Sequence, residues 1–269
     1  MEFTPYLKTL NSLFPQHPLI VKPSIPFTVL ILSPHPDDES ITGSLALRLM
    51  HENNAHVINV AVTLGSNKDR QKPRLKELEN ACNYLEFDLD LLNENWAKKS
   101  KELKILLQKY RPQLILAPHL KDHHPTHIKT SKLLLKSLKG LKLNTIIAWT
   151  EFWAPIEKPN CLIEVPTEIV ELQMKALEMH KGEVARNPYH LRLPAWMMDN
   201  VRRGSEIIST IGSKSPQIPF GVIYHLELFK NDKVMKLKLP THFLSSFADI
   251  GQIFKEILDA ASGSKTKVK

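Results

Sequence analysis

The sequence predicts a Rossmann-like, doubly wound α/β fold whose mostly parallel sheet is flanked by helices. Short β-branched or aliphatic runs with few charges alternate with longer segments whose apolar residues recur every three or four positions. The short runs are typical of buried parallel strands, and the longer segments of amphipathic helices that cover a sheet. This alternation is the pattern of βαβ units, and we expect the 269 residues to be built around one such sheet.

The first part of the chain accounts for the parallel sheet. The expected strands cover residues 27–33, 56–63, about 87–92, 113–118 and 144–149. The expected helices cover residues 39–52, 70–85, 98–110 and 126–138. The common winding of such sheets places the first and fourth strands side by side.

The later segments are expected to wall the site rather than to form a second domain. They are a proline-rich segment over residues 154–166, helices over 167–181, 194–209 and 243–261, and a strand over 220–229. No Gly/Ser-rich or Pro-rich linker divides the middle of the chain, which favours a single domain over residues 27–261. Residues 1–26 are then an N-terminal extension, and residues 262–269 are expected to be a disordered tail.

Composition narrows the class of protein. Cys82 and Cys161 are the only cysteines and neither belongs to a Cys-x-x-Cys pair, which argues against a disulfide framework or a thiolate zinc site. The first residues show no charged stretch followed by an apolar signal core, and no uncharged apolar run approaches the roughly 18 residues that span a bilayer. We therefore expect a soluble, cytoplasmic protein.

The net charge of +8 has two interpretations. It could reflect an acidic partner such as a nucleic acid, or simply a solvated basic surface. The lysines are spread over many amphipathic segments rather than gathered into one stripe, which favours the solvated surface. No specific nucleic-acid partner is expected, and a homo-oligomer is compatible with the sequence.

The segment Ser33–Glu39 follows the first expected strand and carries potential metal ligands. His35 and Asp38 are three residues apart on a loop that prolines stiffen on either side of the imidazole. Zinc favours such nitrogen and oxygen ligands, and a catalytic zinc site needs three protein ligands and an open position. Asp37 and Asp38 are adjacent and should point in different directions. One of them can bind metal while the other acts as a general base.

The segment Asp122–His127 follows the fourth expected strand and can complete the site. His124 and His127 are three residues apart at a loop-to-helix junction, where Pro125 suits the first helical turn. One histidine can be the third ligand, and the other can donate a proton or stabilise an oxyanion. The spacing alone does not decide between them. The pool of possible ligands is His35, Asp37, Asp38, Asp122, His123, His124 and His127.

Each segment also has a simpler structural interpretation. The Asp-Asp-Glu run could cap a helix, and His-Pro-Thr-His could be a surface loop. Because both segments follow adjacent strands, whose carboxyl ends meet at the same edge of a sheet, we favour a shared site for metal-dependent hydrolysis. For His119 and His123, a supporting role and a purely structural role are equally compatible with the sequence.

From Phe27 to Phe229 the sequence resembles the LmbE-like (PIG-L) family of zinc-dependent N-deacetylases, which act mostly on small molecules and glycolipids that contain N-acetylglucosamine. The strongest matches are a strand followed by His-Pro-Asp-Asp-Glu, here His35–Glu39, and an Asp-x-His-Pro-x-His pattern, here Asp122–His127. Softer matches are Thr63-Leu-Gly65, Arg74-x-x-Glu77-Leu78, Trp153 and Glu227-x-Phe229.

The resemblance implies roles for the site residues. It implies that His35, Asp38 and His127 hold Zn²⁺, although another divalent metal such as Fe²⁺ also suits these ligands. Asp37 is then the general base for the attacking water, and His124 stabilises the oxyanion of the tetrahedral intermediate. The implied fold is the same α/β sheet that the hydrophobic pattern predicts.

The sequence departs from the family pattern near the substrate. Thr126 stands where many bacterial members have an aspartate that could orient His124, a role that Asp122 could take over. The run His180–Glu183 replaces a frequent His-x-Ser-Gln. Arg74 matches an arginine that the family uses near the sugar. The departures leave the metal ligands intact and affect the identity of the substrate.

The implied function is removal of the N-acetyl group from an N-acetylglucosamine-type amino sugar or glycoconjugate, which releases acetate and a free amine. One alternative is a zinc amidase that acts on another small-molecule amide. A second alternative is a non-catalytic protein of the same fold that binds acidic ligands with its basic surface. The intact set of His35, Asp38 and His127 favours an enzyme with a small-molecule substrate.

Overall fold

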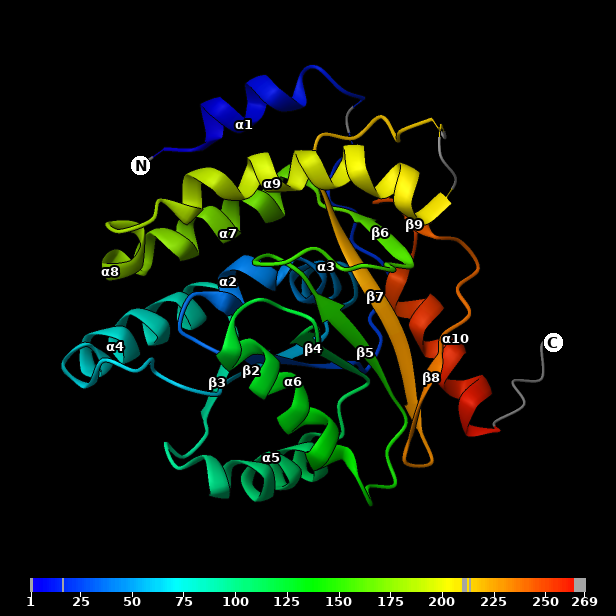
Figure 1. The fold of residues 1–269 in the computed structure, drawn as a ribbon. Coiled ribbons are helices and arrows are strands. Elements are labelled where there is room, and N and C mark those ends of the chain that lie inside the picture. The colour runs from blue at the N-terminus through cyan, green and yellow to red at the C-terminus, as the bar shows by residue number, and fades with distance from the viewer. Residues whose placement is uncertain (1, 16, 210–211, 213, 264–269) are drawn as a thin grey trace.

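The computed structural model describes residues 2–15, 17–209, 212 and 214–263. Within these ranges a nine-stranded mixed sheet forms the centre, with helices on both of its faces (Figure 1). The predicted Rossmann-like α/β fold is therefore confirmed. Among the described residues, no helix is both long and apolar enough to cross a membrane.

Five parallel strands form the half of the sheet that carries the two histidine-bearing loops. They are β1 (Thr28–Ser33), β2 (His56–Ala61), β3 (Asp88–Leu91), β4 (Leu114–Pro118) and β5 (Thr145–Thr150). Their spatial order is β3-β2-β1-β4-β5. Val29 of β1 pairs with Val57 of β2 on one side and with Leu114 of β4 on the other. The predicted neighbourhood of the first and fourth strands is thus confirmed.

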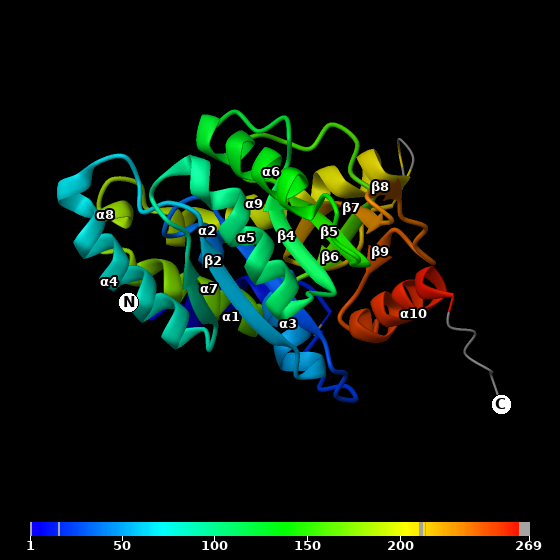
Figure 2. The ribbon, with the colours of Figure 1, turned by 90° about the horizontal axis from the view of Figure 1, so that it is seen from below.

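The alternation of side chains along these strands creates two hydrophobic cores. Leu30 and Leu32 of β1 face helices α5 (Trp96–Tyr110) and α6 (Pro125–Leu138), which lie in front of the sheet in Figure 2. Val29 and Ile31 face the opposite core. The helices of that core include α2 (Asp38–Thr42), α3 (Ser44–Asn53), α4 (Lys68–Tyr84), α7 (Thr167–Met179), α9 (Tyr189–Gly204) and α10 (Ile250–Ser262).

The later part of the chain extends the sheet with antiparallel pairing. Strand β7 (Gly221–Lys230) pairs antiparallel with β5 and with β6 (Cys161–Glu164), and β6 pairs parallel with β9 (Phe243–Leu244). Strand β8 (Lys233–Lys236) continues from β7 as a hairpin. Strand β6 lies inside the proline-rich segment, where the pattern predicts no strand.

Several helix boundaries differ from the expected ones. The helix expected over residues 39–52 is two helices, α2 and α3, that meet at Gly43. The one expected from residue 243 begins only at Ile250, because Phe243 and Leu244 pair with β6 and the Asp249 side chain caps the helix. The one expected over residues 167–181 ends at Met179, and a short helix α8 (Lys181–Val184) follows. The one expected over residues 194–209 starts earlier as α9, and a π-helix, η1 (Ser205–Ser209), completes it.

The N-terminal residues pack against the domain through helix α1 (Thr4–Asn11). Phe3 and Leu7 are buried, and the Thr4 hydroxyl donates to Glu171 of α7 over 2.6 Å. Of the expected tail, Ser262 is the last residue of α10, and residues 264–269 lie outside the described residues. The division of the chain into an extension, one domain and a tail stays a prediction.

A buried ion pair joins the α2–α3 region to the later strands. The Arg48 guanidinium donates to Glu52 over 2.5 and 3.0 Å and to the carbonyls of Glu164 and Ser245, and both charged side chains are fully buried.

Removing the charge of one partner leaves the other charge buried without its counter-ion, so we expect Glu52→Gln to lower the free energy of unfolding by about 3–5 kcal/mol. Urea titration measures this loss. Glu79→Gln, at an exposed position, is the control and should change it by less than about 0.5 kcal/mol. Equal losses in the two variants would contradict this role for the buried pair.

Candidate metal centre and the surrounding cleft

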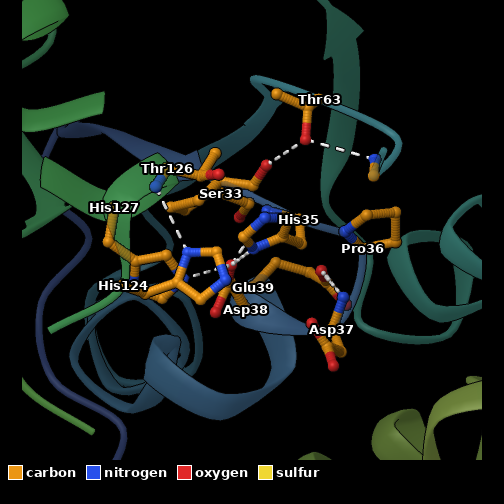
Figure 3. Close-up of polar contacts among 12 residues, drawn as sticks. Ser33, His35, Pro36, Asp37, Asp38, Glu39, Thr63, His124, Thr126 and His127 are labelled. Carbon is orange, nitrogen blue, oxygen red and sulfur yellow. Dashed lines mark hydrogen bonds and ion pairs between the residues drawn. The ribbon is translucent and has the colours of Figure 1, made fainter. Parts of the chain in front are cut away.

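The loops that follow β1 and β4 bring three imidazoles together at the carboxyl edge of the sheet (Figure 3). The ring centroids of His35 and His124 are 4.7 Å apart, those of His124 and His127 are 4.9 Å apart, and those of His35 and His127 are 5.3 Å apart. One ring nitrogen from each histidine lies within 4.8 Å of the other two. Adjacent parallel strands thus place side chains about 90 residues apart in one cluster.

Asp38 adds a carboxylate to this cluster. Its Oδ2 atom is 3.4 Å from His35 Nδ1 and 3.5 Å from His127 Nε2, and it accepts the His35 backbone N–H over 2.8 Å. Burial alone would raise the pKa of Asp38, but the neighbouring His127 and His35 lower it to about 2. The cluster therefore offers imidazole nitrogens and an ionised carboxylate, the donors that zinc prefers.

The two ring nitrogens of His127 have different surroundings in the described part of the chain. Its Nδ1 atom is 3.3 Å from Asp122 Oδ2, whereas its Nε2 atom is buried without a hydrogen-bond partner among the described residues. A proton on Nδ1 that is shared with Asp122 leaves the Nε2 lone pair directed at His35 and Asp38. A buried nitrogen that lacks a hydrogen bond and lies beside two further donors fits a divalent cation.

His124 is held in a different way. It is the N-cap residue of α6, and its Nδ1 accepts the Thr126 backbone N–H over 3.2 Å, with Pro125 in the first helical turn as expected. Burial, together with the nearby His35 and His127, lowers the pKa of His124, which favours the neutral ring. A neutral ring that accepts at Nδ1 carries its proton on Nε2 and can donate it. Asp122 Oδ1 accepts the His124 backbone N–H over 2.7 Å, so one carboxylate orients both histidines of this loop.

Asp37 occupies an unusual backbone conformation. Its φ of 116° lies in a region that residues other than glycine rarely adopt, and its side chain makes no capping bond to α2. Burial is the largest of the causes that raise the pKa of Asp37 well above its ordinary value, and the Asp38 and Glu39 carboxylates add to it. The carboxylates of Asp37 and Asp38 point in different directions (Figure 3), as their adjacency in sequence predicts. Simple helix capping does not account for this segment.

A cleft of about 970 Å³ opens over the cluster. Its wall near the centre is aromatic: the ring of Trp153 lies 6.2 Å from that of His127 and 5.3 Å from that of Tyr189. Arg74 also lines the cleft, and its Nη2 atom donates to the Pro36 carbonyl over 2.9 Å. Further out, the indole of Trp96 contributes to the lining.

Not every histidine of the second segment belongs to the cluster. His119 is buried, and its Nε2 atom lies 3.0 Å from the Ala154 carbonyl oxygen, which links the loop after β4 to the loop after β5. His123 is exposed. The local sequence pattern does not single out Trp96 or Tyr189, which line the cleft from α5 and α9, because both lie outside the two motifs. Glu183 of α8 also lines the cleft, and it belongs to the run that departs from the family pattern.

Comparison with known proteins gives a family match and similar folds. Residues 30–138 match the model of the PIG-L family, described as GlcNAc-PI de-N-acetylase. No curated protein sequence matches the chain. The N,N′-diacetylchitobiose deacetylase from Pyrococcus horikoshii is similar in structure, with a TM-score of 0.57, 21% identity, and coverage of 74% of this chain and 83% of that one.

Two further solved structures share the fold. A triple mutant of the deacetylase Orf2 of the teicoplanin pathway has a TM-score of 0.57 and 15% identity over 76% of this chain and 99% of that one. GalB, the 4-carboxy-2-hydroxymuconate hydratase from Pseudomonas putida KT2440, has a TM-score of 0.58 and 15% identity over 79% of this chain and all of that one. The fold thus occurs in proteins named for different reactions, and only the site can specify the chemistry. The resemblance to the LmbE-like (PIG-L) family is confirmed, because residues 30–138, which carry both histidine-bearing segments, match its model.

Proposed function

We propose that this protein is a metal-dependent hydrolase that removes the N-acetyl group from an N-acetylglucosamine-type amino sugar or glycoconjugate. The observation that carries the proposal is the buried Nε2 atom of His127, which makes no hydrogen bond to the described residues and lies beside His35 and Asp38 in the lining of the cleft. The match to a family described as GlcNAc-PI de-N-acetylase, and the fold shared with two deacetylases, support an N-acetylated amino sugar as the substrate.

The proposed metal ligands are the donors that meet around Asp38 Oδ2. His35, Asp38 and His127 would hold Zn²⁺ or another divalent ion such as Fe²⁺. A bound ion of this kind polarises a carbonyl and lowers the pKa of a nearby water. By distance alone His124 could be a ligand too. Its hydrogen bond from Thr126 favours a protonated Nε2, however, and a protonated nitrogen has no lone pair for a metal.

The remaining groups supply the proton transfers. The Asp37 carboxylate accepts a proton from the attacking water as the water oxygen bonds to the amide carbon. The His124 Nε2–H donates to the oxygen that gains negative charge at that carbon. When the carbon–nitrogen bond breaks, the proton held by Asp37 passes to the departing nitrogen. The products are acetate and the free amine. Burial raises the pKa of Asp37, which makes its carboxylate a better proton acceptor than an exposed aspartate.

The cleft suits a substrate larger than the acetamido group alone. Its volume of about 970 Å³ lies near the upper end of the range for small-molecule sites. Trp153 and Tyr189 offer apolar ring faces in the cleft, and the Arg74 guanidinium also lines it. This combination fits a sugar, which presents hydroxyls at its edges and apolar C–H groups on its faces.

A panel of substrates tests the substrate class. We expect purified, metal-loaded protein to release acetate from N,N′-diacetylchitobiose or another N-acetylglucosamine conjugate, and to leave N-acetylated amino acids of similar size unchanged. The measurement is acetate release followed enzymatically, with appearance of the free amine as a second readout. Release from the amino-acid amides alone would replace this proposal with the amidase alternative. No release from any amide would favour a non-catalytic role.

A further inference from the structure

The peptide group between Pro36 and Asp37 is held from both sides. Arg74 Nη2 donates to the Pro36 carbonyl oxygen over 2.9 Å, and the Asp37 N–H donates to Glu39 Oε2 over 3.0 Å. This peptide leads into the residue with φ of 116°. Because a rare backbone conformation persists only where its surroundings over-determine it, these two bonds help to fix the direction of the Asp37 side chain.

Glu39 and Arg74, the two side chains that bond to this peptide, are both contacted by residues of the short turn after α7. His180 Nε2 is 2.8 Å from Glu39 Oε1, and both of these side chains are almost completely buried. Glu183 Oε1 is 3.6 Å from Arg74 Nη2 and 2.8 Å from Arg70 Nη2. His180 thus supports the N–H side of the peptide through the Glu39 carboxylate. Glu183 supports its carbonyl side through the Arg74 guanidinium.

Glu183 lies near the Nη2 atom of Arg74, and Gly65 packs against its Nη1 atom. Gly65 has φ of 91°, and a Cβ atom built on it would lie 2.5 Å from Arg74 Nη1. The turn at Gly65 is itself tied to the first loop, because the Thr63 hydroxyl donates to the Pro34 carbonyl over 2.7 Å (Figure 3). Arg74 therefore lies between Gly65 and Glu183 with little freedom to move.

We propose that His180 and Glu183 are positioning residues for the hydrolysis: through Glu39 and Arg74 they fix the Pro36–Asp37 peptide, and with it the orientation of the Asp37 carboxylate. The proposal rests on the proposed function, in which Asp37 is the base. It also gives Arg74 a role in this chain that is separate from contact with the sugar. Loss of the positioning role of Arg74 would lower kcat, whereas loss of a contact with the sugar would raise KM.

Substitutions in the turn separate positioning from binding. We expect Glu183→Gln and His180→Gln to lower kcat for N,N′-diacetylchitobiose by about 10- to 100-fold, with KM and bound metal unchanged, because small misplacements of a catalytic group have effects of this size. Glu183→Asp should recover part of the loss, because it keeps the charge. Lys181→Ala, at an exposed position in the same turn, is the matched control and should behave like the wild type.

Hydrogen exchange of the segment 33–42 gives a readout that does not depend on activity. We expect this segment to exchange about tenfold faster in both variants than in the wild type. His180→Gln weakens the support of the Asp37 N–H through Glu39, and Glu183→Gln weakens the support of the Pro36 carbonyl through Arg74. Thermal unfolding establishes which variants are folded, and if His180→Gln does not fold, Glu183→Gln decides the question alone.

The outcomes distinguish this inference from the proposed function. If a folded Glu183→Gln variant shows unchanged exchange, or an unchanged kcat, the positioning role is wrong. A raised KM with an unchanged kcat would instead make the turn part of the substrate site. If the wild type releases no acetate, the proposed function fails, and the exchange rates still decide whether the turn fixes the Pro36–Asp37 peptide.

Discussion

Asp37→Asn is expected to lower kcat for acetate release by about 10²- to 10⁴-fold, the usual contribution of a general acid or base, and to leave the bound metal in place. Asparagine keeps the shape of the side chain and tolerates positive φ better than most residues, so the backbone at φ 116° should survive the change. What is lost is the group that accepts the proton. The measurement is kcat together with metal content by atomic spectroscopy.

A second substitution at the same position checks this interpretation. Asp37→Ala removes the same group and should lose a similar share of turnover, again with its metal retained. If Asp37→Asn and Asp37→Ala both keep wild-type kcat, another residue is the base. If both lose their metal, Asp37 belongs to the ligand set and the division of labour with Asp38 is wrong.

His127→Ala is expected to lose both bound metal and acetate release. The buried Nε2 atom of His127 has no hydrogen-bond partner among the described residues, and its removal leaves only two of the three proposed ligands, His35 and Asp38. We expect acetate release below detection, and less than one tenth of the wild-type metal after dialysis. Such a loss of metal requires the affinity for the ion to fall about tenfold or more. Even substitutions of residues that only support a metal ligand usually lower the affinity by that amount.

His119→Ala is the matched control for this loss. His119 is also a buried histidine of the loop after β4, but its Nε2 atom lies beside the Ala154 carbonyl rather than the cluster. The variant should therefore keep its metal, even where its stability falls. Retention of a full complement of metal by His127→Ala would contradict the proposed ligand set.

The same assay separates the two possible ligand sets. Asp38→Ala should lose metal, and His124→Ala should keep metal while losing turnover, because the Thr126 N–H already occupies His124 Nδ1. The opposite pattern, with metal lost only in His124→Ala, would indicate a centre formed by the three histidines.

The sequence was sufficient for the parts of the fold that depend on local patterns. The runs that became β1, β2, β4 and β5 are apolar and bounded by polar residues, and every one of them is largely buried. The placement of β1 beside β4 followed from the common winding of such sheets. Strand β6 was not predicted, because its four residues become a strand only by pairing with β7 and β9, which lie far along the chain.

The candidate site divides in the same way. The residues that surround the metal position come from two short segments, so their spacing and chemistry are visible in the sequence. The contacts that support these residues are not visible in the sequence. Glu39 and His180, for example, are 141 residues apart and meet only in the folded chain. The family resemblance marks the run His180–Glu183 as a departure from the pattern, but it does not show which groups these side chains contact. The geometry of that turn had to come from the structure.

Acetate release measured on the same preparations as metal content tests the central claim most directly. Wild-type protein stripped with a chelator and reloaded with increasing Zn²⁺ or Fe²⁺ should release acetate from N,N′-diacetylchitobiose in proportion to the metal bound, reaching its plateau at one ion per chain. Full acetate release from protein that holds no metal, or no release from any N-acetylated sugar at one bound ion per chain, would contradict a metal-dependent amino-sugar deacetylase.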